Sequence, residues 1–157
     1  MANKSRKLTP GELREAKSVF GLSIDYDKVI VHEATAYFFQ PNGTAITPNG
    51  EIYFPPADYK YSFATNRSDA AWLIHELTHV WQHQRGMWVR LRGMANRNYD
   101  YGDLSKSKLA FLSQGVEVQA SIVGDYYRIK YGLKPVHGTG ALSDYERTIP
   151  FISSRRA

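Results

Sequence analysis

One short stretch of the sequence has residue types and a spacing that suit metal-ion chemistry. Residues 75–79 read His-Glu-Leu-Thr-His, the pattern H-E-x-x-H. In a helix, His75 and His79 lie on one face about 6 Å apart along the axis, so both imidazoles can reach one tetrahedral Zn²⁺. Glu76 would then stand beside the metal, where its carboxylate can accept a proton from water on the ion. The motif predicts two zinc ligands and a general base.

The residues around the motif favour a metal site over a structural role. At about 100° per residue, the apolar residues of this helix form one stripe: Leu73, Ile74, Leu77, Val80 and Trp81. His75 and His79 fall outside the stripe, whereas buried structural histidines would lie within it. A row of histidines exposed to solvent is the remaining alternative.

A third protein ligand is expected from another helix. Glu117 shares a helical face with the small residues Ala120, Ser121 and Gly124, which would let that helix pack closely against the motif helix. A carboxylate at this contact would complete a two-His, one-Glu site with a fourth position left for water. The alternative is an exposed or ion-paired Glu117. His83 lies roughly another 6 Å along a straight helix, which is too far for the same metal.

Other polar residues are weaker candidates. Asp125 could orient a ligand histidine, or it could be a plain surface carboxylate. His32 and Glu33, at a strand end, are not expected to be ligands. A group that stabilises an oxyanion is also needed, and the sequence leaves five candidates open: Tyr99, Tyr101, Tyr126, Tyr127 and His137.

The local pattern predicts an α+β fold that positions these residues. Thr9 as N-cap, Pro10 and Glu12 predict a helix to about Phe20, ending at Gly21. Ser68-Asp69 should cap the motif helix, which runs to about Arg85, and a third helix should cover about 113–131. Strands are predicted at 28–32, 35–40, 44–47 and 51–54, joined by two Asn-Gly turns into a small antiparallel sheet. Residues 88–92 suggest a short extended piece, and 134–157 should be loop-like.

Length and composition limit the class of protein. The 157 residues predict one domain over 1–157 with short basic tails, and 13% aromatic residues exclude disorder as the main state. No apolar run approaches the roughly 20 residues of a membrane span, and the basic first residues lead into no signal-peptide segment. The lack of cysteine excludes disulfides and thiolate ligands. The net charge of +5 allows a nucleic-acid partner, which we do not expect because the charge is spread.

Residues 74–82 resemble the motif helix of zincin-like metallopeptidases associated with contractile injection systems. The wider chain is similar to Vgr-related and Rhs-associated proteins of type VI secretion loci, through residues 8–12, 47–56, 117–120 and 142–147. The resemblance implies a zincin core, with His75 and His79 as ligands, Glu76 as base and Glu117 as the gluzincin-type third ligand. It also implies an effector or accessory of the secretion apparatus, made in the bacterial cytoplasm and exported without a signal peptide.

The leading functional hypothesis is a zinc-dependent metallopeptidase acting on a protein or peptide. One alternative is an amidase or peptidase that acts on peptidoglycan, since a basic, aromatic surface could hold an anionic glycopeptide. The other is a non-catalytic adaptor of a secretion component, with a structural zinc. A site closed by four protein ligands would favour the adaptor, and an open position would favour catalysis.

Overall fold

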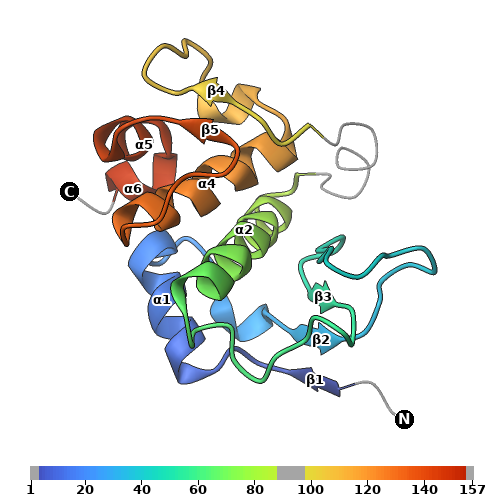
Figure 1. Cartoon of the computed structure of the whole chain (residues 1–157). Helices are drawn as coiled ribbons and strands as arrows, with labels where there is room; N and C mark the ends of the chain where they lie inside the picture. The colour runs from blue at the N-terminus through green and yellow to red at the C-terminus, as the bar shows by residue number, and fades with distance from the viewer. Residues whose placement is uncertain (1–3, 88–97, 155–157) are drawn as a thin grey trace.

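The computed structural model describes residues 4–87 and 98–154, so the extended piece predicted at 88–92 lies outside the described residues. Five α-helices and two small sheets are found within these ranges (Figure 1). The helices are α1 (Pro10–Phe20), α2 (Arg67–Gln84), α4 (Val116–Lys130), α5 (Leu142–Thr148) and α6 (Pro150–Ser154). The strands are β1 (Lys4–Arg6), β2 (Val31–Glu33), β3 (Ile52–Phe54), β4 (Gly102–Asp103) and β5 (Gly138–Thr139). The α+β prediction is confirmed.

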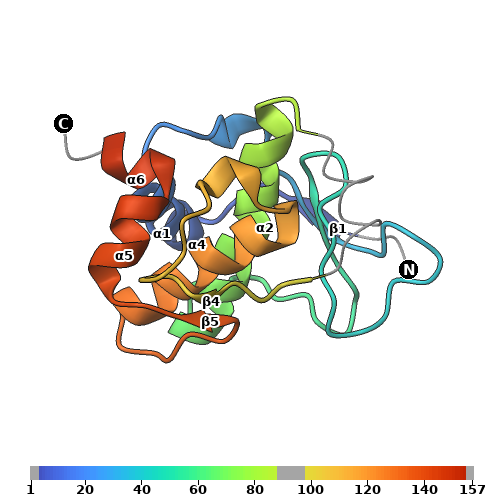
Figure 2. The ribbon, with the colours of Figure 1, turned by 90° about the horizontal axis from the view of Figure 1, so that it is seen from above.

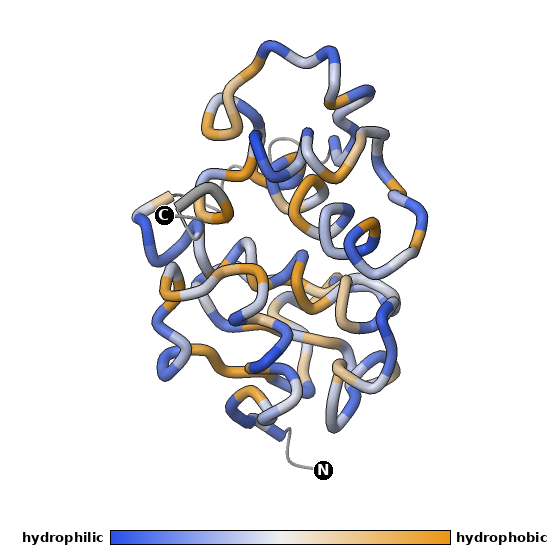
Figure 3. Tube along the Cα trace, turned by 90° about the vertical axis from the view of Figure 1, so that its left-hand side faces the viewer, coloured by the Kyte–Doolittle hydropathy of each residue, from blue (hydrophilic) through white to orange (hydrophobic). Residues whose placement is uncertain are grey.

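Helix α2 forms the centre of the molecule. Figures 1 and 2 place the β1–β3 sheet on one side of it and α4 with α5 on the other. Its polar residues Glu76, His79 and Gln82 are as buried as its apolar stripe, so part of the face opposite the stripe is also covered by protein. The hydropathy colours of Figure 3 change every few residues along the chain, and no helix of the described residues is long and apolar enough to cross a membrane.

The helix ends follow local capping chemistry. Helix α1 has the predicted capping box: Glu12 N donates to Thr9 Oγ1, and Thr9 N donates to Glu12 Oε1. Helix α2 begins earlier than predicted, because Asn66 and not Ser68-Asp69 caps it, accepting from Asp69 N at 2.8 Å. Helix α4 begins at Val116, after a separate 3₁₀ turn at Phe111–Ser113.

The β1–β3 sheet differs from the antiparallel sheet that we predicted. Strand β1, which we expected to be part of a basic tail, pairs antiparallel with β2, but β2 and β3 are parallel. The segment 34–51 is long enough to carry the chain back to the start of a parallel strand, so its two Asn-Gly turns do not join β2 to β3 as a hairpin.

The strand predicted at 35–40 is wrong, and the strand at 44–47 is reduced to one bridge between Ile46 and Tyr53. The reason is a buried amide: Gln40 accepts from Ala36 N and donates to the carbonyls of Thr44 and Tyr53. The loop folds around this side chain instead of extending.

The prediction that 134–157 is loop-like is also wrong. Helices α5 and α6 occupy much of it, and β5 pairs in parallel with β4. Tyr145, Ile149, Phe151 and Ile152 are buried in the core, so apolar packing stabilises two helices too short to be stable alone. Gly138, Gly140 and Pro150 lie at the ends of these elements, and Pro135 lies in the loop before β5.

Candidate metal centre

The three predicted ligands lie together at the contact between α2 and α4. Glu117, in the first turn of α4, places Oε1 3.2 Å from His75 Nε2 and 2.8 Å from His79 Nε2. One ligand atom from each residue lies within 4.8 Å of the other two, so the group could hold a metal ion. Two imidazole nitrogens and one carboxylate oxygen are a donor set that suits Zn²⁺.

Small residues bring the two helices close together. A Cβ atom added to Gly124 would lie 3.5 Å from His75 Cβ and 3.6 Å from the carbonyl oxygen of Ala71. Ala120 and Ser121, on the same side of α4, are buried. This close approach, expected from the spacing of the small residues, lets the short Glu117 side chain reach both histidines.

Gln82 orients His79, and the sequence reasoning missed it. The amide nitrogen of Gln82 donates to the carbonyl of Val116 at 3.0 Å and to Gln119 Oε1 at 2.9 Å, which leaves Oε1 facing His79 Nδ1 at 2.8 Å. His79 Nδ1 is therefore the donor to Gln82, and Nε2 faces Glu117, where it would present its lone pair to a metal ion held between them. The available signal in the sequence was a polar residue three positions after a ligand histidine, on the same face of the helix.

Glu76 is buried beside this group and is held by one hydrogen bond. Thr47 Oγ1 donates to Glu76 Oε1 at 2.9 Å, and Glu76 Oε2 lies 3.9 Å from His75 Nε2. Burial raises the pKa of the Glu76 carboxyl above its usual range. A carboxylate with a raised pKa and one oxygen not hydrogen-bonded within the described residues is suited to accepting a proton.

The charges of the group stabilise one another. Burial opposes protonation of His79, but the carboxylates of Glu117 and Glu76 outweigh it and raise the pKa of His79 to about 9. Burial would raise the pKa of Glu117, yet the two histidines hold it well below its usual range. The carboxylate of Glu117 therefore favours a positive charge between the two helices, as a proton or as a metal ion.

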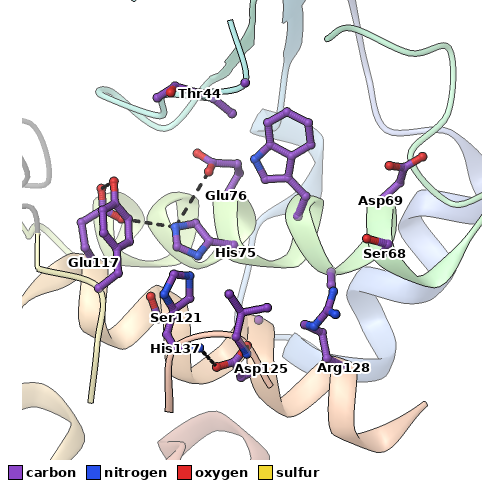
Figure 4. A pocket seen from close by; sticks show the side chains of 17 residues that line it. Thr44, Ser68, Asp69, His75, Glu76, Glu117, Ser121, Asp125, Arg128 and His137 are labelled. Carbon is purple, nitrogen blue, oxygen red and sulfur yellow. Dashed lines mark hydrogen bonds and ion pairs between the residues drawn. The ribbon is translucent and has the colours of Figure 1, made fainter. Parts of the chain in front are cut away.

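The group lies at the wall of a cavity of about 450 Å³ (Figure 4). Of the five candidates for stabilising an oxyanion, Tyr99 and His137 line it and the other three do not. Tyr99 Oη lies 3.5 Å from Glu117 Oε2, and its ring stacks on His137 with 5.6 Å between the centroids. Tyr101 is bound to Asp125 and Tyr145, and Tyr127 to Glu15 and Arg67.

Asp125 does not orient a ligand histidine, nor is it a surface carboxylate. It is buried, and it accepts hydrogen bonds from Tyr101 Oη and from the backbone nitrogens of Val136 and His137. It therefore fixes the segment that carries His137 at the edge of the cavity. His83 is exposed, and His32 bonds Ser5 and Glu51 on the sheet, so neither belongs to the metal-binding group.

Comparison with known proteins places the chain in a family and shows its relatives. The chain belongs to the eCIS core domain family, whose model matches residues 8–87. It is 35% identical over 137 residues to the type VI secretion system spike protein VgrG2b of Pseudomonas aeruginosa; the match covers 80% of this chain and 13% of that protein. The solved structure of the effector domain of VgrG2b matches with a TM-score of 0.76 and 27% identity, over 94% of this chain and 83% of that one. The chain is therefore homologous to the effector domain of a secretion spike.

Proposed function

We propose that residues 1–157 form a zincin-like zinc metallopeptidase domain, a hydrolase that acts as an effector or accessory of a type VI secretion system. The observation that carries this proposal is the convergence of His75, His79 and Glu117 beside the buried Glu76, on the wall of an open cavity. The similarity to the VgrG2b effector domain supports the secretion role. That role would have the chain made in the cytoplasm and exported by the secretion apparatus.

Each residue then has a defined task in hydrolysis of an amide bond. His75, His79 and Glu117 would hold the zinc, and Gln82 would keep His79 in the ligating tautomer. A zinc ion at this position supplies Lewis acidity, which acidifies water and polarises the amide carbonyl. Glu76 accepts the proton of the attacking water and passes it to the leaving amine, while Thr47 fixes the carboxylate in place.

The open cavity favours catalysis over a structural zinc. Structural zinc sites are usually closed by four protein ligands, whereas catalytic sites keep one position open. Within residues 4–87 and 98–154 the candidate group has three members, and His75 and Glu117 line the cavity. A substrate can therefore approach the fourth position.

The proposal is tested by metal content and hydrolysis measured together. Purified protein reconstituted with zinc should hold about one ion per chain, and His79→Ala and Glu117→Ala should lose it. Glu76→Gln should keep the ion and lose peptide hydrolysis by about a hundredfold or more. Wild-type protein that binds no zinc would overturn the metal site, and a hydrolytic, zinc-loaded Glu76→Gln would overturn the role of the base.

A further inference from the structure

The cavity extends well beyond the metal-binding group, along the N-terminal half of α2. One end is formed by Glu117 and His75, and the other by Ser68, Asp69 and Arg128 (Figure 4). Ser68 precedes His75 by seven residues on α2, which is about 10 Å along the helix axis. An extended peptide covers that distance with about three residues at 3.3 Å each. The far end is therefore within reach of a substrate side chain or terminus near the scissile bond.

The far end contains one cation that the protein leaves unneutralised. Arg128 is half-buried, and its Nε donates to the carbonyl oxygen of Lys134 at 2.6 Å. Among the described residues it has no carboxylate partner. Figure 4 shows its guanidinium turned toward Ser68. The two terminal nitrogens of the guanidinium are left as donors for a ligand.

The acidic residues at this end form no ion pair with Arg128 among the described residues, because their carboxylate oxygens bind other groups. Asp69 accepts from Lys60 Nζ at 2.6 Å and from Asn66 Nδ2 at 2.8 Å. Asp125 accepts from Tyr101 Oη and from two backbone nitrogens. The guanidinium of Arg128 is therefore left without a carboxylate partner among the described residues, and a carboxylate of a ligand can fill that position.

We infer that Arg128 forms an acid-binding subsite that receives a carboxylate of the substrate about three residues from the scissile amide. The planar guanidinium matches a carboxylate through two parallel N–H donors. The carboxylate can belong to an acidic side chain or to a free C-terminus. The peptidase activity of the proposed function is assumed here, but the subsite is defined by binding and can be measured without turnover.

Equilibrium binding of matched peptides tests the subsite. The full chain, in the metal state in which it is purified, is titrated by NMR with acetyl-Ala-Ala-Gln-amide, acetyl-Ala-Ala-Glu-amide and acetyl-Ala-Ala-Gln with a free C-terminus. The wild type should bind at least one carboxylate peptide about fivefold to tenfold more tightly than the neutral amide. The two charged peptides separate the side-chain source from the terminal source.

Two variants separate recognition from structure. Arg128→Gln should abolish the preference and leave the affinity for the neutral peptide unchanged, and Arg128→Lys should restore part of it. Lys130→Gln is the matched control, because it removes the same charge from the same helix at an exposed position outside the cavity. A preference that persists in Arg128→Gln would mean that the carboxylate binds elsewhere, such as directly to the metal, and would overturn the subsite.

The inference is overturned if the wild type does not distinguish the peptides. It is equally overturned if Arg128→Gln weakens the neutral and charged peptides to the same degree, since that result means a structural role for Arg128. A carboxylate preference without any hydrolysis would contradict the peptidase and leave the subsite standing. Hydrolysis without a carboxylate preference would support the peptidase and overturn the subsite.

Discussion

Glu12 and Glu76 are both buried helical carboxylates, and the protein treats them in opposite ways. Glu12, in α1, receives hydrogen bonds from two guanidinium nitrogens of Arg6 and from the backbone nitrogens of Thr9 and Phe63. Glu76, in α2, receives one within the described residues, from Thr47. The first carboxylate joins β1, α1 and the segment before α2, and the second faces a cavity.

The difference separates an acid that stabilises the fold from one that the proposed function would use as a base. A buried carboxylate whose oxygens are all hydrogen-bonded by the protein has no acceptor position left for a ligand. A buried carboxylate with one oxygen left over is costly to the fold and is retained where it can exchange a proton. On this criterion Glu12 stabilises the fold, while Glu76 is available to a substrate.

The largest effect expected from this comparison is on stability. Glu12→Gln keeps the shape of the side chain but leaves Arg6 without its ion-pair partner, so it should lower the free energy of unfolding by about 3 kcal/mol. Glu76→Gln is the matched change at an equally buried site, and it should alter stability by less than about 1 kcal/mol because few bonds are lost. Urea unfolding of the metal-free proteins measures both values. An equal loss of unfolding free energy in Glu12→Gln and Glu76→Gln would refute the distinction between the two acids.

The sequence predicted these two acids for different reasons. The capping box placed Glu12 correctly at the start of α1, but its contacts with Arg6 and Phe63 N connect segments far apart in the chain. The H-E-x-x-H spacing and the small residues near Glu117 predicted which side chains would meet, since helical periodicity fixes the face on which each lies. Local rules therefore predicted which residues of the candidate metal-binding group meet, and missed those that support them.

The parts of the fold that could not be predicted from the sequence depend on tertiary contacts. The side chain of Gln40 satisfies backbone groups within 36–53, and this overrides the strand propensity of the aromatic residues at 37–39. The parallel pairing of β2 with β3 depends on the path of the connecting segment, which turn signals do not specify. Helices α5 and α6 form because buried side chains such as Tyr145 and Phe151 pack onto the core.

Gln82 shares features of the residues that stabilise the fold and of those at the candidate metal site. It is fully hydrogen-bonded like Glu12, yet one of its partners is a proposed metal ligand. Gln82→Met has a similar size and removes these bonds, so zinc affinity should fall by about tenfold to a hundredfold as His79 loses its orientation. Competition with a chromophoric chelator measures this affinity. Gln84→Met, on the same helix but bonded to the backbone of Asp25, is the control and should bind zinc normally.

Thr47 gives the smallest and most specific test, because it supplies the one described hydrogen bond to Glu76. Thr47→Val preserves the shape and removes the donor, so the carboxylate is less well placed and kcat for peptide hydrolysis should fall by about threefold to tenfold. Zinc content should not change, since Thr47 is not in the metal-binding group. In a Glu76→Gln background the same substitution should have no further effect, because the proton acceptor that Thr47 positions is already gone. An additional loss in the double variant would show that Thr47 acts on the substrate itself and not through Glu76.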